Sequence, residues 1–164
     1  MISGPIQDAL NNQIRLEIQS AYAYLAMAAY AESINLPGFG AWFRAQWHEE
    51  LGHAEKLMTI MHDRGGRVVL QGVEKPAVDY TSPLDIFKQV LAHEQKVTAM
   101  INKLYEAALK ENDYATQVEI QWFIKEQVEE EKNATAVIEQ LKMMGETGTP
   151  LLMMDRQLGA RGTK

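Results

Sequence analysis

Four long segments with the periodicity of α-helices are the feature that most constrains how this chain folds. Each is about 28 residues long, which gives a helix of about 42 Å, typical of a bundle and long for an ordinary globular domain. Pro and Gly, which interrupt helices, are concentrated in the gaps between the segments. The predicted helices run from Pro5 to Ser33, from just after Gly38 to Gly65, from Pro83 to Asn112, from Asp113 to Gly145 and, for a short fifth helix, from Pro150 to Leu158.

The lengths of the connections predict how these helices are arranged. The first two long helices, and likewise the last two, are joined by short turns, which favours antiparallel neighbours. The link 65–82 is about 18 residues, and when extended it reaches about 60 Å, enough to run the length of a bundle. Its segment Arg67–Leu70 looks extended rather than helical. We therefore expect an all-α four-helix bundle with one long crossover over residues 1–146, and a C-terminal helix and tail of the same domain over residues 147–164.

Polar side chains interrupt the apolar stripe of every long helix near its midpoint. The stripes advance in alternating steps of three and four residues, the period of a bundle seam. On the second helix the stripe consists of Phe43, Gln46, Glu50, His53, Leu57 and Ile60, and on the third of Phe87, Leu91, Glu94, Thr98, Ile101 and Tyr105. In each helix the first interruption lies about a dozen residues from the start, so all of them fall near mid-height whichever way the helix runs. The interrupting residues are Glu17, Glu50, His53, Glu94, Gln127 and Glu130.

These interruptions predict a site for two cations. Burying a bare carboxylate costs several kcal/mol, and no Lys or Arg lies on the stripes to balance four of them. Two divalent cations would close the charge balance, and oxygen ligands with one imidazole suit iron, manganese or zinc. A single Glu on such a stripe is more often a solvated residue, so the inference rests on the set. Gln127 can equally be a hydrogen-bonding core residue, and Tyr24, seven residues after Glu17, either a plain core tyrosine or a redox-active neighbour of the metals.

Composition excludes several other classes of function. The chain of 164 residues contains no Cys, so it forms no disulfide, no thiolate zinc site and no cysteine-ligated iron–sulfur cluster. A net charge of -6 disfavours nucleic acid as a partner. No stretch approaches the roughly 20 apolar residues of a membrane span, and the first residues lack a secretory pattern. We expect a cytoplasmic protein without a membrane or nucleic-acid partner.

Four stretches carry a family pattern along essentially the whole chain: Asn12–Ile18 (NQIRLEI), Trp47–His53 (WHEELGH), His93–Gln95 (HEQ) and Gln121–Glu131 (QWFIKEQVEEE). In these stretches the chain resembles the bacterial non-haem ferritins. The resemblance implies a ferritin-like fold and an iron-storage function. It further implies a ferroxidase that oxidises Fe(II) with O₂ or H₂O₂, and a shell of 24 identical subunits around the ferric mineral.

The resemblance also implies ligand sets. One iron would be held by Glu17, Glu50 and His53, and the other by Glu50, Glu94 and Glu130, with Glu50 bridging. Gln127 would lie beside the pair, with Tyr24 and Trp122 close by. A third iron site would be formed by Glu49, Glu126 and Glu129, although a solvated acidic face would show the same pattern.

The chain differs from three related families at residues that are typical of those families. Bacterioferritins carry a second Glu-x-x-His on the fourth helix, where this chain has Gln127 and Glu130, and a haem-ligating Met where it has Leu51, so no haem is expected. Rubrerythrins add a cysteine-rich iron domain, and this chain has no Cys. Animal ferritins line their three-fold channels with two acidic residues, and the matching positions here are Gln117 and Ile120, which puts an acidic entry route in doubt.

Two other functions remain open at this point. The first is a di-iron enzyme that acts on organic substrates or peroxide without storage, and the second is a non-catalytic bundle that binds only partners or metal. The short fifth helix has two interpretations as well, because in ferritins it lines a four-fold axis, whereas a plain tail would pack on its own bundle.

Overall fold

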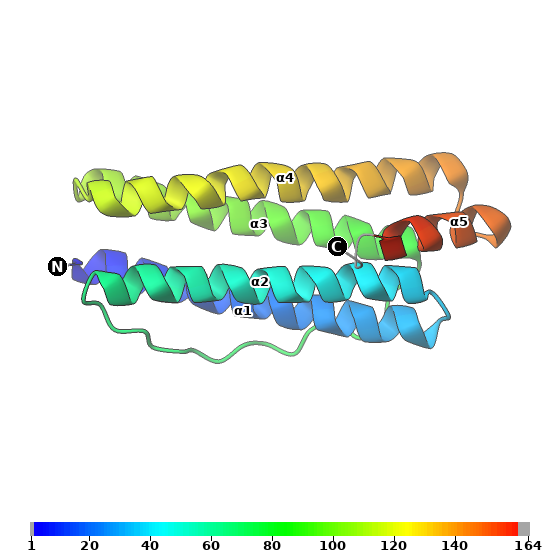
Figure 1. The fold of residues 1–164 in the computed structure, drawn as a ribbon, viewed down its shortest axis with the longest axis horizontal. Coiled ribbons are helices and arrows are strands. Elements are labelled where there is room, and N and C mark those ends of the chain that lie inside the picture. The colour runs from blue at the N-terminus through cyan, green and yellow to red at the C-terminus, as the bar shows by residue number, and fades with distance from the viewer. Residues whose placement is uncertain (1, 161–164) are drawn as a thin grey trace.

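The computed structural model describes residues 2–160, and all regular structure in that range is α-helical (Figure 1). The all-α fold is therefore confirmed. None of the helices in the described part of the chain is both long and apolar enough to cross a membrane. The helices are α1 (Gly4–Ser33), α2 (Pro37–Asp63), α3 (Pro83–Lys110), α4 (Tyr114–Met144) and α5 (Gly148–Gly159).

The helix ends follow local chemistry. Ser82 caps α3, because its hydroxyl accepts a hydrogen bond from the main-chain N–H of Asp85 at 3.1 Å. Asp113 caps α4 in the same way through the N–H of Thr116 at 3.1 Å. The second helix ends two residues before the predicted Gly65, which takes the left-handed conformation with φ of 69° just beyond it.

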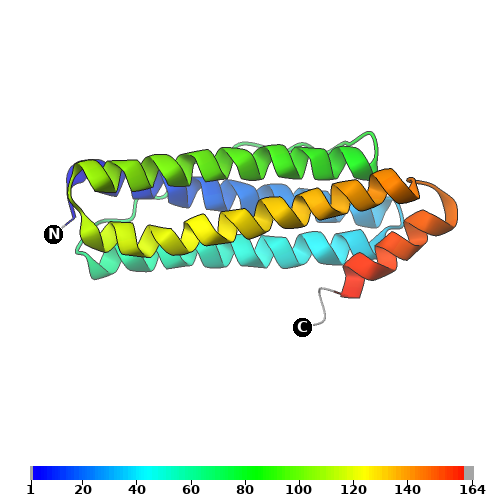
Figure 2. The same ribbon diagram turned by 90° about the horizontal axis from the view of Figure 1, so that it is seen from above.

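The long crossover leaves α2 and α3 parallel, while α1 with α2 and α3 with α4 form antiparallel pairs (Figures 1 and 2). It runs along the outside of α1, where amide side chains hold it. Asn11 donates to the main-chain oxygen of Arg67 at 3.1 Å and accepts from the N–H of Val69 at 2.8 Å. Gln19 pairs with both main-chain groups of Glu74 in the same manner. These amides take the place of a neighbouring strand, so the segment stays extended without a sheet.

Two apolar clusters fill the bundle and leave a polar level between them. One lies towards α5 and contains the rings of Phe43 and Phe87, which are tilted by 32° with centroids 5.3 Å apart. The other lies towards the opposite end and contains Leu57 and Phe123. Every glutamate that interrupts a predicted stripe is buried at the level between them.

The predicted buried face is correct on α1, α2 and α4 but only partly so on α3. There the predicted stripe residues Leu91, Thr98 and Tyr105 are only half-buried. Their preceding neighbours, Val90, Val97 and Leu104, are buried instead. The buried face of α3 is thus displaced from the predicted one towards the preceding residues, by less than the roughly 100° of one full residue. Glu94 and Ile101 belong to both faces and remain buried.

The fifth helix packs on α2 of its own bundle. Met154 joins the core cluster, and Asp155 accepts a hydrogen bond from the main-chain N–H of Phe39 at 3.0 Å. The approach requires Gly38, because a Cβ there would lie 1.7 Å from the main-chain oxygen of Asp155. The division into 1–146 and 147–164 stays a prediction, and residues 161–164 of the predicted tail lie outside the described part.

Candidate metal centre

The first predicted ligand set converges in the bundle interior. Glu17 comes from α1, and Glu50 and His53 come from one face of α2 because they are three residues apart. The Nδ1 atom of His53 lies 3.4 Å from Glu50 Oε2 and 3.8 Å from Glu17 Oε2. One ligand atom from each residue lies within 4.8 Å of the other two, and all three side chains are buried.

The other pair of helices supplies Glu94 and Glu130 at the same level. The hydroxyl of Tyr24 donates to Glu94 Oε1 at 2.6 Å, and the side-chain amide of Gln127 donates to Glu94 Oε2 at 3.2 Å. The amide of Gln46 donates to Glu130 Oε2 at 2.9 Å. Within residues 2–160, the second predicted set, with Glu50 as the bridge, is not gathered to the same 4.8 Å spacing. Its carboxylates are buried but engaged by these hydrogen bonds.

The centre is short of positive charge. Burial raises the pKa of Glu50 well above its usual value, and repulsion from Glu17 and Glu94 adds to this against the hydrogen bond from His53. Burial likewise raises the pKa of Glu94, although hydrogen bonds from Tyr24 and Gln127 oppose the shift.

Burial acts against the charged form of His53, but polar contacts with Glu17 and Glu50, and attraction to them, raise its pKa to about 11. No Lys or Arg is buried between residues 2 and 160. Such a cluster needs protons or added cations to be stable.

One oxygen of Glu17 is prepared to act as a ligand. Its Oε1 accepts a hydrogen bond from Gln13 at 2.7 Å, whereas its Oε2 is buried without a hydrogen-bond partner. A buried carboxylate oxygen rarely lacks a partner. Oε2 is also the atom that faces His53, so a cation bound in the cluster would satisfy it.

A second acidic group adjoins the first. Ligand atoms of Glu49, His53 and Glu126 lie within 4.8 Å of one another, and both glutamates are half-buried. Of the residues in the predicted third site, the structure brings Glu49 and Glu126 together, with His53 as their neighbour. Glu129 is exposed and lies outside this group.

Aromatic rings hold the imidazole in place. Trp122 and Phe123 pack edge-on against His53, with ring centroids at 5.4 Å and 6.0 Å. Lys56 Nζ lies 4.5 Å from the centroid of Trp122. Trp122 therefore lies beside the centre, as the resemblance implies.

Sequence reasoning missed three residues that orient the carboxylates. Gln13 had a readable signal, because it precedes Glu17 by one helical turn on the same face. Gln46 and Thr98 lie on the predicted stripes, but their partners Glu130 and Glu131 are on another helix. Partners of that kind become visible only when the packing of the helices is known.

A four-helix bundle with a long crossover and an interior of glutamates around one histidine defines a carboxylate-rich, metal-binding bundle protein. The model of the family described as Ferritin-like domain matches residues 7–144. The chain belongs to the ferritin family of iron-storage proteins, and this membership implies iron binding and supports a homo-oligomer.

Individual relatives agree with this assignment. The chain is 38% identical over 161 residues to the bacterial non-heme ferritin of Staphylococcus aureus (strain NCTC 8325 / PS 47), covering 98% of this chain and 97% of the relative. It is 35% identical to that of Bacteroides fragilis (strain 638R), covering 98% and 100%. The resemblance to bacterial non-haem ferritins is thus confirmed.

Solved structures give the same fold. An open pore ferritin from the hyperthermophilic archaeon Archaeoglobus fulgidus superposes with a TM-score of 0.95 at 47% identity, covering 97% of this chain and 98% of that one. A closed form of that ferritin, engineered by site-directed mutagenesis, gives the same TM-score and identity and covers 97% of each chain.

Proposed function

We propose that this ferritin oxidises Fe(II) at a pair of adjacent positions in its centre and stores the product as a ferric mineral inside a shell of identical subunits. The observation that carries the proposal is the buried cluster of Glu17, Glu50 and His53, with one unpartnered carboxylate oxygen. Oxygen-rich ligation with one imidazole suits iron.

The residues take distinct roles in this proposal. The first Fe(II) binds Glu17, Glu50 and His53, whose ligand atoms already lie at a suitable spacing. The second binds Glu50, Glu94 and Glu130, with Glu50 as the bridge and Gln127 beside it. To reach the second ion, Glu130 exchanges the hydrogen bond from Gln46 for the cation. Glu94 binds the cation through lone pairs that the hydrogen bonds from Tyr24 and Gln127 leave free. A third iron binds outside the pair at Glu49, Glu126 and Glu129, and the spacing of the first two residues near His53 supports it.

The reaction balances with iron as substrate. Each of two Fe(II) ions loses one electron, and O₂ takes up both electrons with two protons to give H₂O₂. When H₂O₂ is the oxidant, the same two electrons and two protons give two molecules of water. The carboxylates favour the harder, more highly charged Fe(III) product. Tyr24 contributes by holding Glu94 through its hydroxyl.

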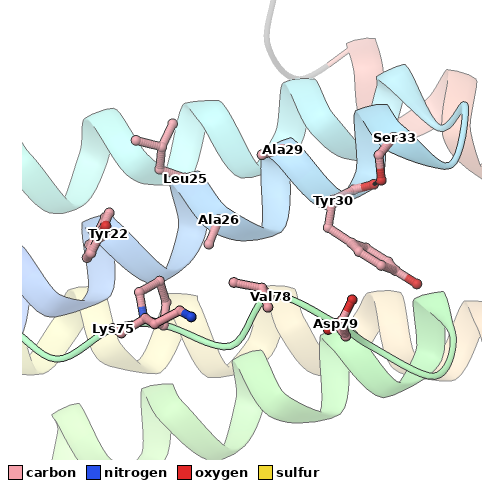
Figure 3. Close-up of a pocket in the computed structure, with 10 residues that line it drawn as sticks. Tyr22, Leu25, Ala26, Ala29, Tyr30, Ser33, Lys75, Val78 and Asp79 are labelled. Atoms are coloured by element: carbon pink, nitrogen blue, oxygen red, sulfur yellow. Dashed lines mark hydrogen bonds between the residues drawn. The ribbon is translucent and has the colours of Figure 1, made fainter.

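Storage requires association, and one apolar groove supports it. A groove of about 520 Å³ separates α1 from the crossover (Figure 3). Tyr22 and Val78 line it and are 45% and 52% exposed. An exposed apolar surface of this kind fits a second copy of the chain. We infer a shell of 24 subunits in the cytoplasm, and sedimentation of the purified protein measures the number of subunits.

The decisive test is the oxidation of added Fe(II) in air. Wild-type protein is expected to oxidise Fe(II) much faster than buffer, and Glu50→Ala is expected to abolish the fast phase because it removes the bridging ligand. An unchanged rate in that variant would refute the bridge. A wild-type rate equal to that of buffer would favour a non-catalytic bundle. A small oligomer with no mineral core would favour a di-iron enzyme that acts on other substrates.

A further inference from the structure

A chain of side-chain hydrogen bonds connects the buried Glu94 to a half-buried carboxylate, Glu131. The hydroxyl of Thr98 lies 2.6 Å from Glu131 Oε1. The side-chain nitrogen of Gln127 lies 3.3 Å from Thr98 Oγ1, and 3.2 Å from both Oε2 and the main-chain oxygen of Glu94. Thr98 is one turn after Glu94 on α3, and Glu131 is one turn after Gln127 on α4. These hydrogen bonds therefore cross between α3 and α4 three times.

The chemistry of the chain fixes its direction. An ionised carboxylate only accepts hydrogen bonds, so the single proton of the Thr98 hydroxyl points to Glu131. The hydroxyl oxygen then offers only lone pairs to Gln127. An amide has one donating and one accepting end, and only the donating end completes this contact. Glu131, acting through Thr98, thus favours the orientation in which the donating end of the Gln127 amide faces α3.

The opposite orientation would be unfavourable. It would place the amide oxygen of Gln127 against the lone pairs of Thr98 and two oxygens of Glu94. In the observed orientation the amide donates to Glu94 Oε2, while Tyr24 donates to Glu94 Oε1. Two neutral donors from different helices therefore hold both oxygens of this buried carboxylate. The hydrogen bonds that fix Glu17 are separate from this chain, because its partner is Gln13.

We propose that Thr98 and Glu131 are positioning residues that fix the amide of Gln127 and, through it, orient Glu94 towards the second cation. This proposal rests on the proposed function, which assigns Glu94 to that cation. Groups that orient the ligands of a metal typically contribute about 10- to 100-fold in affinity or activity. The role is selective for the second cation, because the ligands of the first cation take no part in this series of hydrogen bonds.

The first test replaces Thr98 in the assembled protein and uses Zn²⁺ as a redox-inert probe in calorimetry. Thr98→Val keeps the branched shape but removes the hydroxyl, and it is expected to weaken the second Zn²⁺ by about tenfold or more while the first is unchanged. Thr98→Ser restores the hydroxyl and is expected to restore binding. Thr135→Val is the matched control, because the hydroxyl of exposed Thr135 donates only to the main-chain oxygen of Glu131, at 2.7 Å.

A second variant covers the case in which Thr98→Val folds poorly. Glu131→Ala frees the proton of Thr98 to turn away from residue 131, so Thr98 no longer presents only lone pairs to Gln127 and holds its amide less firmly. It is expected to weaken the second Zn²⁺ and to raise the KM for Fe(II) more than it lowers kcat. Glu139→Ala is the control, because it removes an equal charge from the exposed face of α4.

The possible outcomes separate the two proposals. Two Zn²⁺ ions bound with wild-type affinities in both Thr98→Val and Glu131→Ala would overturn the positioning role and leave the proposed function intact. Equal weakening of both ions would also overturn it, because the chain would then act on the whole centre. A wild-type protein that binds no pair of cations would refute the proposed function itself.

Discussion

His53 belongs to both candidate ligand groups, the buried one with Glu17 and Glu50 and the half-buried one with Glu49 and Glu126. Its Nδ1 faces Glu17 and Glu50, and a ring nitrogen also lies within 4.8 Å of oxygens of Glu49 and Glu126. A metal-bound imidazole usually donates its second N–H to a carboxylate, which fixes its tautomer and orientation. Glu49 and Glu126 lie close enough to His53 for the two groups of carboxylates to share one imidazole.

The charge at His53 and its neighbours gives the first prediction. Burial raises the pKa of Glu50 and of Glu94, and its acidic partners raise that of His53 to about 11, so the metal-free centre holds protons at neutral pH. A divalent cation must displace them. We expect Zn²⁺ binding to release protons, and its apparent affinity to rise with pH. Calorimetry at pH 7 in buffers of different ionisation enthalpy measures the release, and identical heats in all buffers would contradict it.

At the scale of single residues, the sequence predicted which residues form the centre better than how their side chains are oriented. Glu17, Glu50 and His53 were predictable, because helical spacing alone places the last two on one face and the acidic interruptions share one height. The separation of Glu94 and Glu130 from Glu50 was not predictable. It depends on hydrogen bonds from Tyr24, Gln127 and Gln46, and each of these bonds joins two different helices.

At the scale of the elements, Asp113 joins the end of α2 to the start of α4. Its Oδ1 accepts from the N–H of Thr116 at the helix start, and its Oδ2 accepts from Arg64 Nη1 at 2.7 Å. Burial favours the protonated form of Asp113, but the hydrogen bonds from Arg64 and Thr116 outweigh it and lower its pKa. Arg64 lies directly after α2, so this single ion pair fixes the separation of two helix ends.

The lowered pKa of Asp113 predicts how its contribution to stability depends on pH. A carboxyl whose folded pKa lies below its unfolded value of about 3.9 stabilises the fold above that value, and the contribution is lost as pH falls through the folded pKa. Asp113→Asn should therefore lower Tm near pH 7. The difference from wild type should shrink below about pH 4. Scanning calorimetry across this range checks it, and a difference that is independent of pH would contradict the role of the ion pair.

The buried face of α3 was less predictable than its start. Ser82 and Pro83 marked the start of α3 because capping is local chemistry. The buried face of α3 is displaced from the predicted one, because Val90 and Leu91 are adjacent apolar residues and periodicity fits either. Packing buries Val90 and leaves Leu91 half-exposed, which a single sequence does not reveal.

At the scale of the whole molecule, the crossover makes one face of the bundle incomplete. The length of the link was enough to predict its course, but not what covers it. Its main chain is held to α1 by amides such as Asn11 and Gln19, while Leu70 is 65% exposed and Val78 52% exposed. Apolar side chains outside a finished core indicate association without specifying its geometry.

Charge placed in the groove between α1 and the crossover tests whether that surface joins subunits. Tyr22→Glu and Val78→Glu each put a carboxylate where an apolar contact with a second copy is proposed (Figure 3). An unpaired charge buried in an interface costs several kcal/mol, and symmetry would repeat it on the facing subunit. We expect sedimentation velocity to show smaller species with unchanged helix content and unchanged first-site Zn²⁺ binding. Tyr22→Phe, which keeps the groove apolar, should assemble normally, whereas glutamate variants that sediment as intact shells would place the subunit contact elsewhere.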